Sequence, residues 1–177
     1  MYRRPVDIVL GKAIFYFILY LLMAIYAYAA VTRWFSLPNV GNYFVFLRFI
    51  IPYILACIFM AMVLSVLVYR REDCIMLFVF LSVPLLFMSG ISWPGSEIPK
   101  FWKYVSWLFP STFGMNGYLR IMGTGASIED IHHEYVGLWC QVGVYGILAC
   151  IMYRLRLKAI VKRLSSAKNR QKMYQEE

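Results

Sequence analysis

Residues 82–125 have the sequence SVPLLFMSGISWPGSEIPKFWKYVSWLFPSTFGMNGYLRIMGTG, an apolar stretch that proline and glycine break several times. The uncharged run in its second half, residues 104–119, has only 16 residues and contains Pro110. A helix needs about 20 apolar residues to cross a ~30 Å hydrocarbon core, so this run is too short to cross. Its many aromatic residues make it too apolar for water. Non-helical backbone is tolerated at membrane depth only where protein or a water-filled cavity supplies hydrogen-bond partners for its N–H and C=O groups. We therefore expect a re-entrant external helical hairpin over about residues 98–122, with its two pieces joined at Phe109-Pro110-Ser111.

The composition of the whole chain is that of a polytopic membrane protein. The chain has 177 residues, of which 62% are hydrophobic and 15% are charged, whereas about a quarter of the residues in a typical soluble domain are charged. We expect an all-α integral membrane protein with no soluble domain of any size. Residues 1–158 would form the membrane domain, and residues 159–177 a basic cytoplasmic tail.

Four segments are long and apolar enough to cross a membrane. The first has 20 uncharged residues between Lys12 and Arg33, and the second has 21 from Phe49 to Tyr69. The last has 19 uncharged residues from Tyr135 to Tyr153. The four predicted spans are residues 8–31, 43–69, 74–91 and 135–153. The third span leads directly into the broken stretch.

The positive charges predict the orientation of these spans. Thirteen Lys and Arg residues fall on one side of the four-span topology and four on the other. The four are Arg33, Lys100, Lys103 and Arg120. Positive charge gathers on the cytoplasmic side of membrane proteins, so both termini are expected in the cytoplasm. A fifth span over residues 104–122 would put one basic end outside, which supports the re-entrant prediction.

The net charge of +9 does not indicate a nucleic-acid partner, because the positive charges flank apolar spans. We expect the basic tail to lie near anionic membrane lipids, in a multi-pass protein of the inner or plasma membrane. A docking role for the tail is a second interpretation. The four cysteines, Cys57, Cys74, Cys140 and Cys150, lie in apolar runs and are expected to pack as small hydrophobic residues.

Two polar features adjoin the second span. Arg48 lies six residues past Asn42, so its side chain can reach the near membrane interface. An alternative role for Arg48 is a charge that faces a substrate pathway. Arg70, Arg71, Glu72 and Asp73 follow the span and predict a tight turn.

The last span is preceded by a polar segment. Ser127 and Asp130 have the spacing of a capping box, so we expect the final helix to begin at Ser127. The sequence contains one weak candidate for a metal site, formed by His132, His133 and Glu129. Two histidines without a third organised ligand make a weak zinc site, so no metal site is predicted. The chain also has no nucleotide-binding loop and no catalytic triad pattern.

Several motifs, in this order, resemble those of permease subunits of type-2 ATP-binding-cassette exporters. Residues 5–12, PVDIVLGK, are similar to the lead into a span in that family. Its proline signature is matched by Pro84, Ser89, Gly90, Pro94 and Pro99. The element that follows in the family is matched by Pro110, Ser111, Thr112, Gly117 and Arg120. Gly125 and Ala126 match a Gly-Ala turn before the last span, so that the resemblance covers about residues 4–158.

The resemblance implies a topology and partners. The chain would hold spans three to six of a six-span permease, its C-terminal half, with a coupling helix expected upstream of Arg3. It would be a fragment or one piece of a split permease. Two permease halves would pair, as a homodimer or a heterodimer, and separate ATPase subunits would bind the ATP. No cofactor is expected on this chain.

The resemblance also implies which residues matter. A gate element at the external end of the pathway would include Ser89, Gly90, Pro94, Pro99, Pro110 and Arg120. The turn at Arg70, Arg71, Glu72 and Asp73 would face the ATPase.

Three functions follow from these observations. The first is an exporter permease subunit or fragment, which is not itself an enzyme. The second is a small membrane scaffold or assembly protein. The third is a membrane-embedded envelope enzyme that uses His132, His133 and Glu129.

Overall fold

The structure, a computed structural model, describes residues 5–34, 41–68, 71–88 and 100–173, and these contain helices and no strand. The helices are α1 (Pro5–Trp34), α2 (Tyr43–Leu67), α3 (Arg71–Met88), α4 (Lys100–Ser106), α5 (Pro110–Thr124) and α6 (His132–Met173). The prediction of an all-helical fold is therefore confirmed for the described residues.

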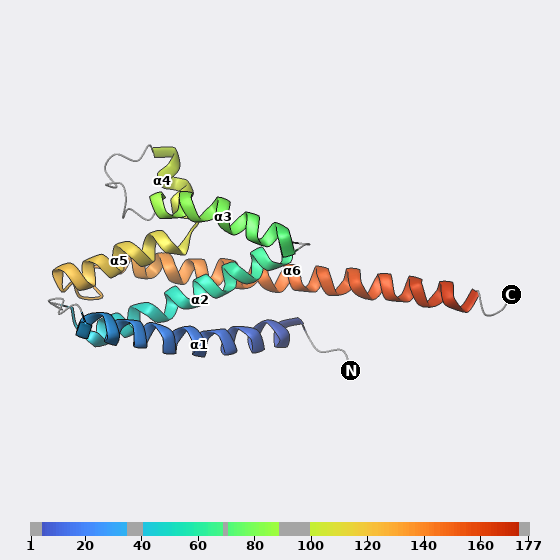
Figure 1. Cartoon of the computed structure of the whole chain (residues 1–177), viewed down its shortest axis with the longest axis horizontal. Helices are drawn as coiled ribbons and strands as arrows, with labels where there is room; N and C mark the ends of the chain where they lie inside the picture. The colour runs from blue at the N-terminus through green and yellow to red at the C-terminus, as the bar shows by residue number, and fades with distance from the viewer. Residues whose placement is uncertain (1–4, 35–40, 69–70, 89–99, 174–177) are drawn as a thin grey trace.

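Helix α2 is at the centre of the bundle. It contacts α6, α1 and α5, and α1 and α5 each contact α6 as well. The N-terminal end of α1, the junction between α2 and α3, and the long extension of α6 all point toward the same end of the bundle (Figure 1). At that end, the Lys12 Nζ lies 3.5 Å from the Tyr153 hydroxyl and 5.4 Å from the centre of its ring. The side chains of α1 and α6 thus meet although 141 residues separate them.

Within the described residues, three helices are long and apolar enough to cross a membrane: Val9–Ala30, Tyr43–Val66 and His132–Arg156. Helix α3 is outside this set because its 18 described residues include Arg71, Glu72 and Asp73 in the first turn. The predicted span over residues 74–91 runs beyond Met88 into residues that the structure does not describe, so this span stays a prediction.

The buried apolar side chains form two clusters along α2. The first cluster joins α1, α2 and α6 and consists of Val9, Ala13, Ile54, Ile58, Met62 and Ala149. The second joins α2, α5 and α6 and consists of Phe46, Phe49, Ala56, Ile121, Ile131 and Leu138. Pro52 is also fully buried, and α2 continues through it as one helix.

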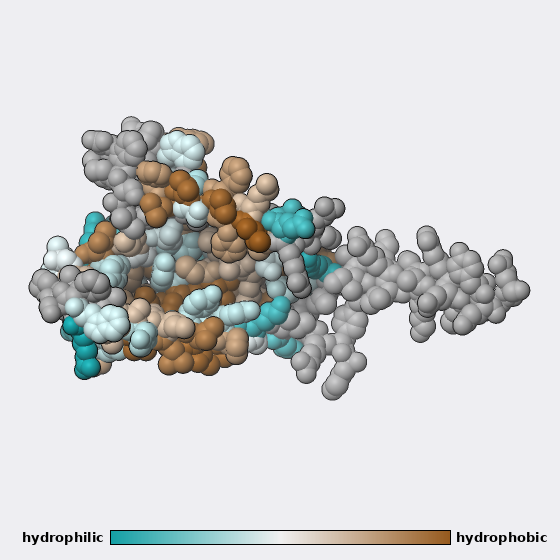
Figure 2. All heavy atoms as spheres, viewed as in Figure 1, coloured by the Kyte–Doolittle hydropathy of each residue, from teal (hydrophilic) through white to brown (hydrophobic). Residues whose placement is uncertain are grey.

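The outer faces of α1 and α3 remain apolar and exposed. Ile14, Phe15 and Leu22 of α1 are each more than half exposed, as are Met76, Phe78 and Phe80 of α3. Figure 2 shows hydrophobic side chains gathered over both helices. Apolar faces of this kind suit contact with lipid or with another membrane helix.

Two local predictions need correction. Arg71, Glu72 and Asp73, which were predicted to lie in a turn with Arg70, form the first turn of α3. Acidic residues are favourable there because the N-terminus of a helix carries partial positive charge. The last helix begins at His132, five residues after the predicted start at Ser127. By contrast, α2 begins at Tyr43 as expected, where the Asn42 side chain accepts a hydrogen bond from the Phe44 N–H at 3.1 Å.

Two glycines let α5 approach α2 closely. A Cβ atom on Gly117 would lie 2.2 Å from Cζ of Phe49, and one on Gly114 would lie 2.2 Å from Cε2 of Tyr53. Such small residues allow helices in membranes to pack backbone against side chain. The aromatic rings of α2 therefore fill the space that α5 leaves at its glycines.

We predict that Gly117→Ala destabilises the protein by about 1–3 kcal/mol, the usual cost of inserting a methyl group into a packed interior. Gly123→Ala, on the same helix, is the control because a Cβ atom there would meet nothing within 4 Å. Thermal unfolding in the same detergent measures both variants. Equal melting temperatures would contradict the close α2–α5 contact.

Candidate functional site

The joint between α4 and α5 is bound to the middle of α6. The Gln141 side chain donates from Nε2 to the carbonyl oxygen of Trp107 at 2.7 Å, and the Tyr145 hydroxyl donates to the carbonyl oxygen of Leu108. Both Gln141 and Tyr145 are buried. The chain turns tightly here, since the N–H groups of Leu108 and Phe109 donate to the carbonyls of Val105 and Ser106. Polar side chains of α6 thus satisfy carbonyl groups that the break between the helices exposes.

Helix α5 runs back along α6 from this joint. Tyr145 is 13 residues into α6, which corresponds to about 20 Å at about 1.5 Å per residue. At its other end, α5 contacts the first turn of α6 through Arg120 and Glu134. The first residue of α5 therefore lies beside the middle of the apolar part of α6. The last turn of α5 lies beside the first turn of α6.

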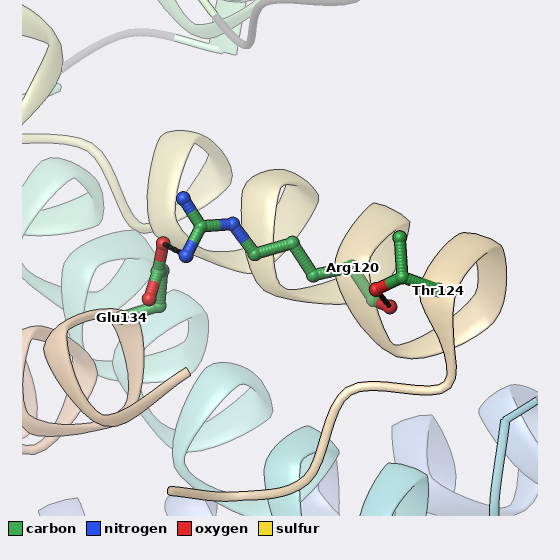
Figure 3. Close-up of polar contacts among 3 residues, drawn as sticks. All are labelled: Arg120, Thr124 and Glu134. Atoms are coloured by element: carbon green, nitrogen blue, oxygen red, sulfur yellow. Dashed lines mark hydrogen bonds and ion pairs between the residues drawn. The ribbon is translucent and has the colours of Figure 1, made fainter. Parts of the chain in front are cut away.

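Arg120 and Glu134 form an ion pair between α5 and α6. Nη1 of Arg120 lies 3.3 Å from Oε1 of Glu134, and the two side chains are 57% and 12% exposed. Figure 3 shows Arg120 reaching along α5 toward Glu134, while Thr124 donates its hydroxyl hydrogen to the carbonyl of Arg120 at 2.7 Å. The arginine is partly in contact with solvent, whereas the carboxylate is enclosed.

Helix α5 ends at Gly125, which has the left-handed backbone angle φ 66°. Its N–H donates to the carbonyl of Ile121 at 3.2 Å, and the N–H of Ala126 donates to that of Arg120. Glycine adopts this conformation without the steric cost that a Cβ atom brings. The turn directs the chain from α5 toward α6.

The segment between α5 and α6 is held by Ser127 and Asp130. The N–H and the hydroxyl of Ser127 both donate to Oδ2 of Asp130, each at 2.9 Å. These hydrogen bonds, first from the backbone and then from the side chain, lower the pKa of the Asp130 carboxyl. Since the folded-state pKa is lowered, this contribution to stability is present above the unfolded pKa of about 3.9. It is lost as the pH falls through the folded value.

Four buried oxygen atoms in α5 and α6 have no hydrogen-bond partner among the described residues: Ser111 Oγ, Thr112 Oγ1, Glu134 Oε2 and Gln141 Oε1. A buried polar atom without a partner costs about 1–3 kcal/mol. All four belong to the elements around the α4–α5 joint and the ion pair. This interface therefore carries unused hydrogen-bonding capacity.

The predicted gate residues fall into two groups. Pro110 is buried in the first turn of α5, a position that suits proline because the N–H it lacks would have no partner within the helix. Arg120 forms the ion pair with Glu134. Ser89, Gly90, Pro94 and Pro99 lie outside the described residues. The structure therefore places Pro110 and Arg120 on one helix and leaves the other four as predictions.

The other candidate residues lie apart from this interface. Arg48 is exposed on the second turn of α2, and Glu72 and Asp73 are exposed in the first turn of α3. Arg71 begins α3, and Arg70 lies outside the described residues. Neither the pathway role of Arg48 nor the ATPase-facing role of residues 70–73 is tested by these positions.

The polar residues predicted as a possible metal or catalytic group lie just before α6 and in its first turn. Glu129, His132 and His133 are all exposed, and the two imidazole rings are 6.5 Å apart. Within the described residues, no group of three His, Cys, Asp or Glu side chains could hold a metal ion. Cys57, Cys74 and Cys150 are half-buried, and Cys140 is exposed.

Sequence reasoning missed Glu134, Gln141 and Tyr145 as site residues. The buried positions of α6 and the residue before it are Ile131, Glu134, Leu138, Gln141, Tyr145 and Ala149. Steps of three and four residues separate them, which is the spacing of one helix face. Polar residues at this spacing in an apolar helix were the sequence signal that could have identified these three residues.

The ion pair supports a double-mutant prediction. Arg120→Gln should lower stability by about 1 kcal/mol, because it leaves the enclosed Glu134 carboxylate without its cation, while solvent around the arginine limits the loss. In a Glu134→Gln background the same change should cost almost nothing. Chemical or thermal unfolding of the four proteins measures the coupling. Additive effects would contradict the pair.

Comparison with known proteins identifies a family for most of the chain. Residues 1–151 match the family described as ABC-2 family transporter protein. The comparisons with curated proteins and with solved structures gave no match. The matched region includes α1 to α5 and the apolar part of α6 up to Ile151. The chain therefore belongs to the ABC-2 transporter family, and it is a membrane permease component of that type of transporter.

Proposed function

We propose that this chain forms part of the substrate pathway of an ATP-binding-cassette exporter, driven by a separate ATPase subunit. The observation that carries the proposal is the α4–α5 pair, whose joint is bound to the middle of α6 while α5 returns to the start of that helix. A helix pair of this form would cover one end of the bundle without crossing the membrane. Together with membership of the ABC-2 family, it favours a gate over a catalytic site.

The proposed topology has four spans and both termini in the cytoplasm. Helices α1, α2, α3 and α6 would cross the membrane, and α4 and α5 would form the re-entrant external hairpin. The support is the distribution of charge along the bundle: Lys12 and Arg154 belong to the end where Tyr153 meets α1, whereas Arg33 and Arg120 belong to the opposite end. Positive charge gathers on the cytoplasmic side.

Helix α3 is proposed as a span because of its surface and its position. It begins beside the end of α2, and its apolar side chains are exposed along most of its length. Its 18 residues rise about 27 Å, close to the ~30 Å of a hydrocarbon core. The exposed faces of α1 and α3 are then available to lipid or to a second permease half, in a homodimer or a heterodimer.

The ATPase is proposed to bind the cytoplasmic end, where α3 begins and α6 extends beyond the bundle (Figure 1). Arg70, Arg71, Glu72 and Asp73 would contribute to that contact. ATP would be bound and hydrolysed on the partner, and this chain would carry no cofactor. By the resemblance of its motifs, the chain corresponds to the last four spans of a six-span permease of the inner or plasma membrane.

Two roles remain for Arg48. Its exposed position near the start of α2 suits a side chain that reaches the external interface. A pathway role would require a second permease half or a substrate to meet the guanidinium group.

The topology predicts opposite accessibility of the two ends. In a variant whose four cysteines are replaced by alanine, Gly123→Cys should react with a membrane-impermeant thiol reagent applied outside intact cells. Ser165→Cys, on the extension of α6, should react only after the cells are permeabilised. The reverse pattern would refute both the orientation and the proposed gate.

The proposed ATPase contact predicts a charge effect. The wild-type chain should copurify with an ATPase subunit from its native membrane, and Glu72→Lys combined with Asp73→Lys should weaken that association about tenfold, as a loss of roughly 1.4 kcal/mol would. Glu129→Lys, an exposed charge reversal at the opposite end, is the matched control. Stable association with other proteins and never with an ATPase would favour the scaffold function.

A further inference from the structure

Three of the four unpartnered oxygen atoms belong to residues that adjoin the α4–α5 joint. Ser111 and Thr112 are in the first turn of α5, directly after the joint, and the amide of Gln141 is held there by its hydrogen bond to Trp107. Thr112 and Gln141 are 7% and 8% exposed, so solvent does not meet their free atoms. The fourth atom, Glu134 Oε2, lies two helical turns away and belongs to the ion pair.

The first turn of α5 adds donors to this place. Its N-cap residue, Phe109, makes no side-chain hydrogen bond to the helix, and Pro110 brings no N–H. The N-terminus of a helix without a side-chain cap presents N–H groups and partial positive charge. The N–H of Thr112 is already used, because it donates to the carbonyl of Phe109 at 3.3 Å. The joint therefore combines the hydroxyl groups of Ser111 and Thr112 and the partial positive charge of α5 with an acceptor, Gln141 Oε1, from α6.

The mixture of donors and acceptors selects the chemistry of a ligand. A cation would meet the positive end of α5, and an anion would meet Gln141 Oε1 in a place of low dielectric constant, where unpaired charge is costly. A neutral hydroxyl group fits both sides, because its hydrogen donates to the amide oxygen while its oxygen accepts from the threonine or serine hydroxyl.

We infer that Ser111, Thr112 and Gln141, which adjoin the α4–α5 joint, form a binding site for a neutral hydroxyl group beside the buried side chains of Thr112 and Gln141. The hydroxyl belongs either to a bound water or to the alcohol group of a larger molecule. The inference concerns hydrogen bonding at the joint alone, so it does not depend on transport or on an ATPase.

The alcohol source is tested by photolabelling of the full chain in phosphatidylcholine vesicles. The probe is octanol that carries a diazirine, and the matched control probe is the corresponding octane. We expect the alcohol to label residues 107–112 and 141–145 about fivefold more than the alkane, the factor that one hydrogen bond supplies. Thr112→Val should remove this preference, whereas Thr112→Ser, which keeps the hydroxyl group, should retain it.

The water source is tested by hydroxyl-radical footprinting, which modifies buried side chains next to bound water. Tyr145 should be modified in the wild type and in Thr112→Ser, and much less in Thr112→Val. Ser111→Ala provides an independent variant with the same expected direction. Each variant is first compared with the wild type by its elution as a monodisperse species.

These outcomes distinguish water from an organic alcohol as the source of the hydroxyl group, and they also test whether the site exists. Selective alcohol labelling that depends on Thr112 identifies an organic hydroxyl group as a ligand. A footprint at Tyr145 that depends on Thr112, without selective alcohol labelling, identifies water as the occupant and also supports the site. Equal labelling by both probes together with a footprint that no variant changes would overturn it.

Discussion

The structure depends on satisfying backbone carbonyl groups where the chain breaks inside a bundle of apolar helices. In hydrocarbon, an unpaired carbonyl has no water to accept from, and each one costs several kcal/mol. The break between α4 and α5 leaves the carbonyls of Trp107 and Leu108 outside any helix, and Gln141 and Tyr145 of α6 meet them. The position of the joint along α6 is therefore set by which turns of α6 carry hydrogen-bond donors.

Packing at α2 then determines how closely α5 can follow. Gly114 and Gly117 bring α5 against Tyr53 and Phe49, while the same face of α5 places Ile121 in the core shared with α6. Because apolar side chains gain little by leaving lipid for protein, such close van der Waals contact is the main attraction between membrane helices. Helix α5 is thus held by hydrogen bonds at one end, by an ion pair at the other, and by close packing between them.

This arrangement bears on the proposed gate. The ion pair between Arg120 and Glu134 is partly solvated, so its contribution to stability is modest. Beside the joint, in contrast, the side chains of Thr112 and Gln141 are buried and retain unused hydrogen-bonding atoms. In the proposed exporter, α5 would therefore be held less strongly at its Arg120 end than at the joint.

The sequence by itself determined the helical class, the apolar segments α1, α2 and α6, and the family. These follow from hydropathy, charge and ordered motifs, which are local properties of the chain. It also predicted a break near Pro110, because proline has no N–H to donate and restricts the residue before it. The start of α6 was misplaced at Ser127, because Asp130 accepts both hydrogen bonds from Ser127 and closes a turn before the helix. Only the tertiary structure decided that Glu134, Gln141 and Tyr145 face α5. Which face of an apolar helix is buried depends on its neighbours, and periodicity within one helix cannot reveal what lies against it.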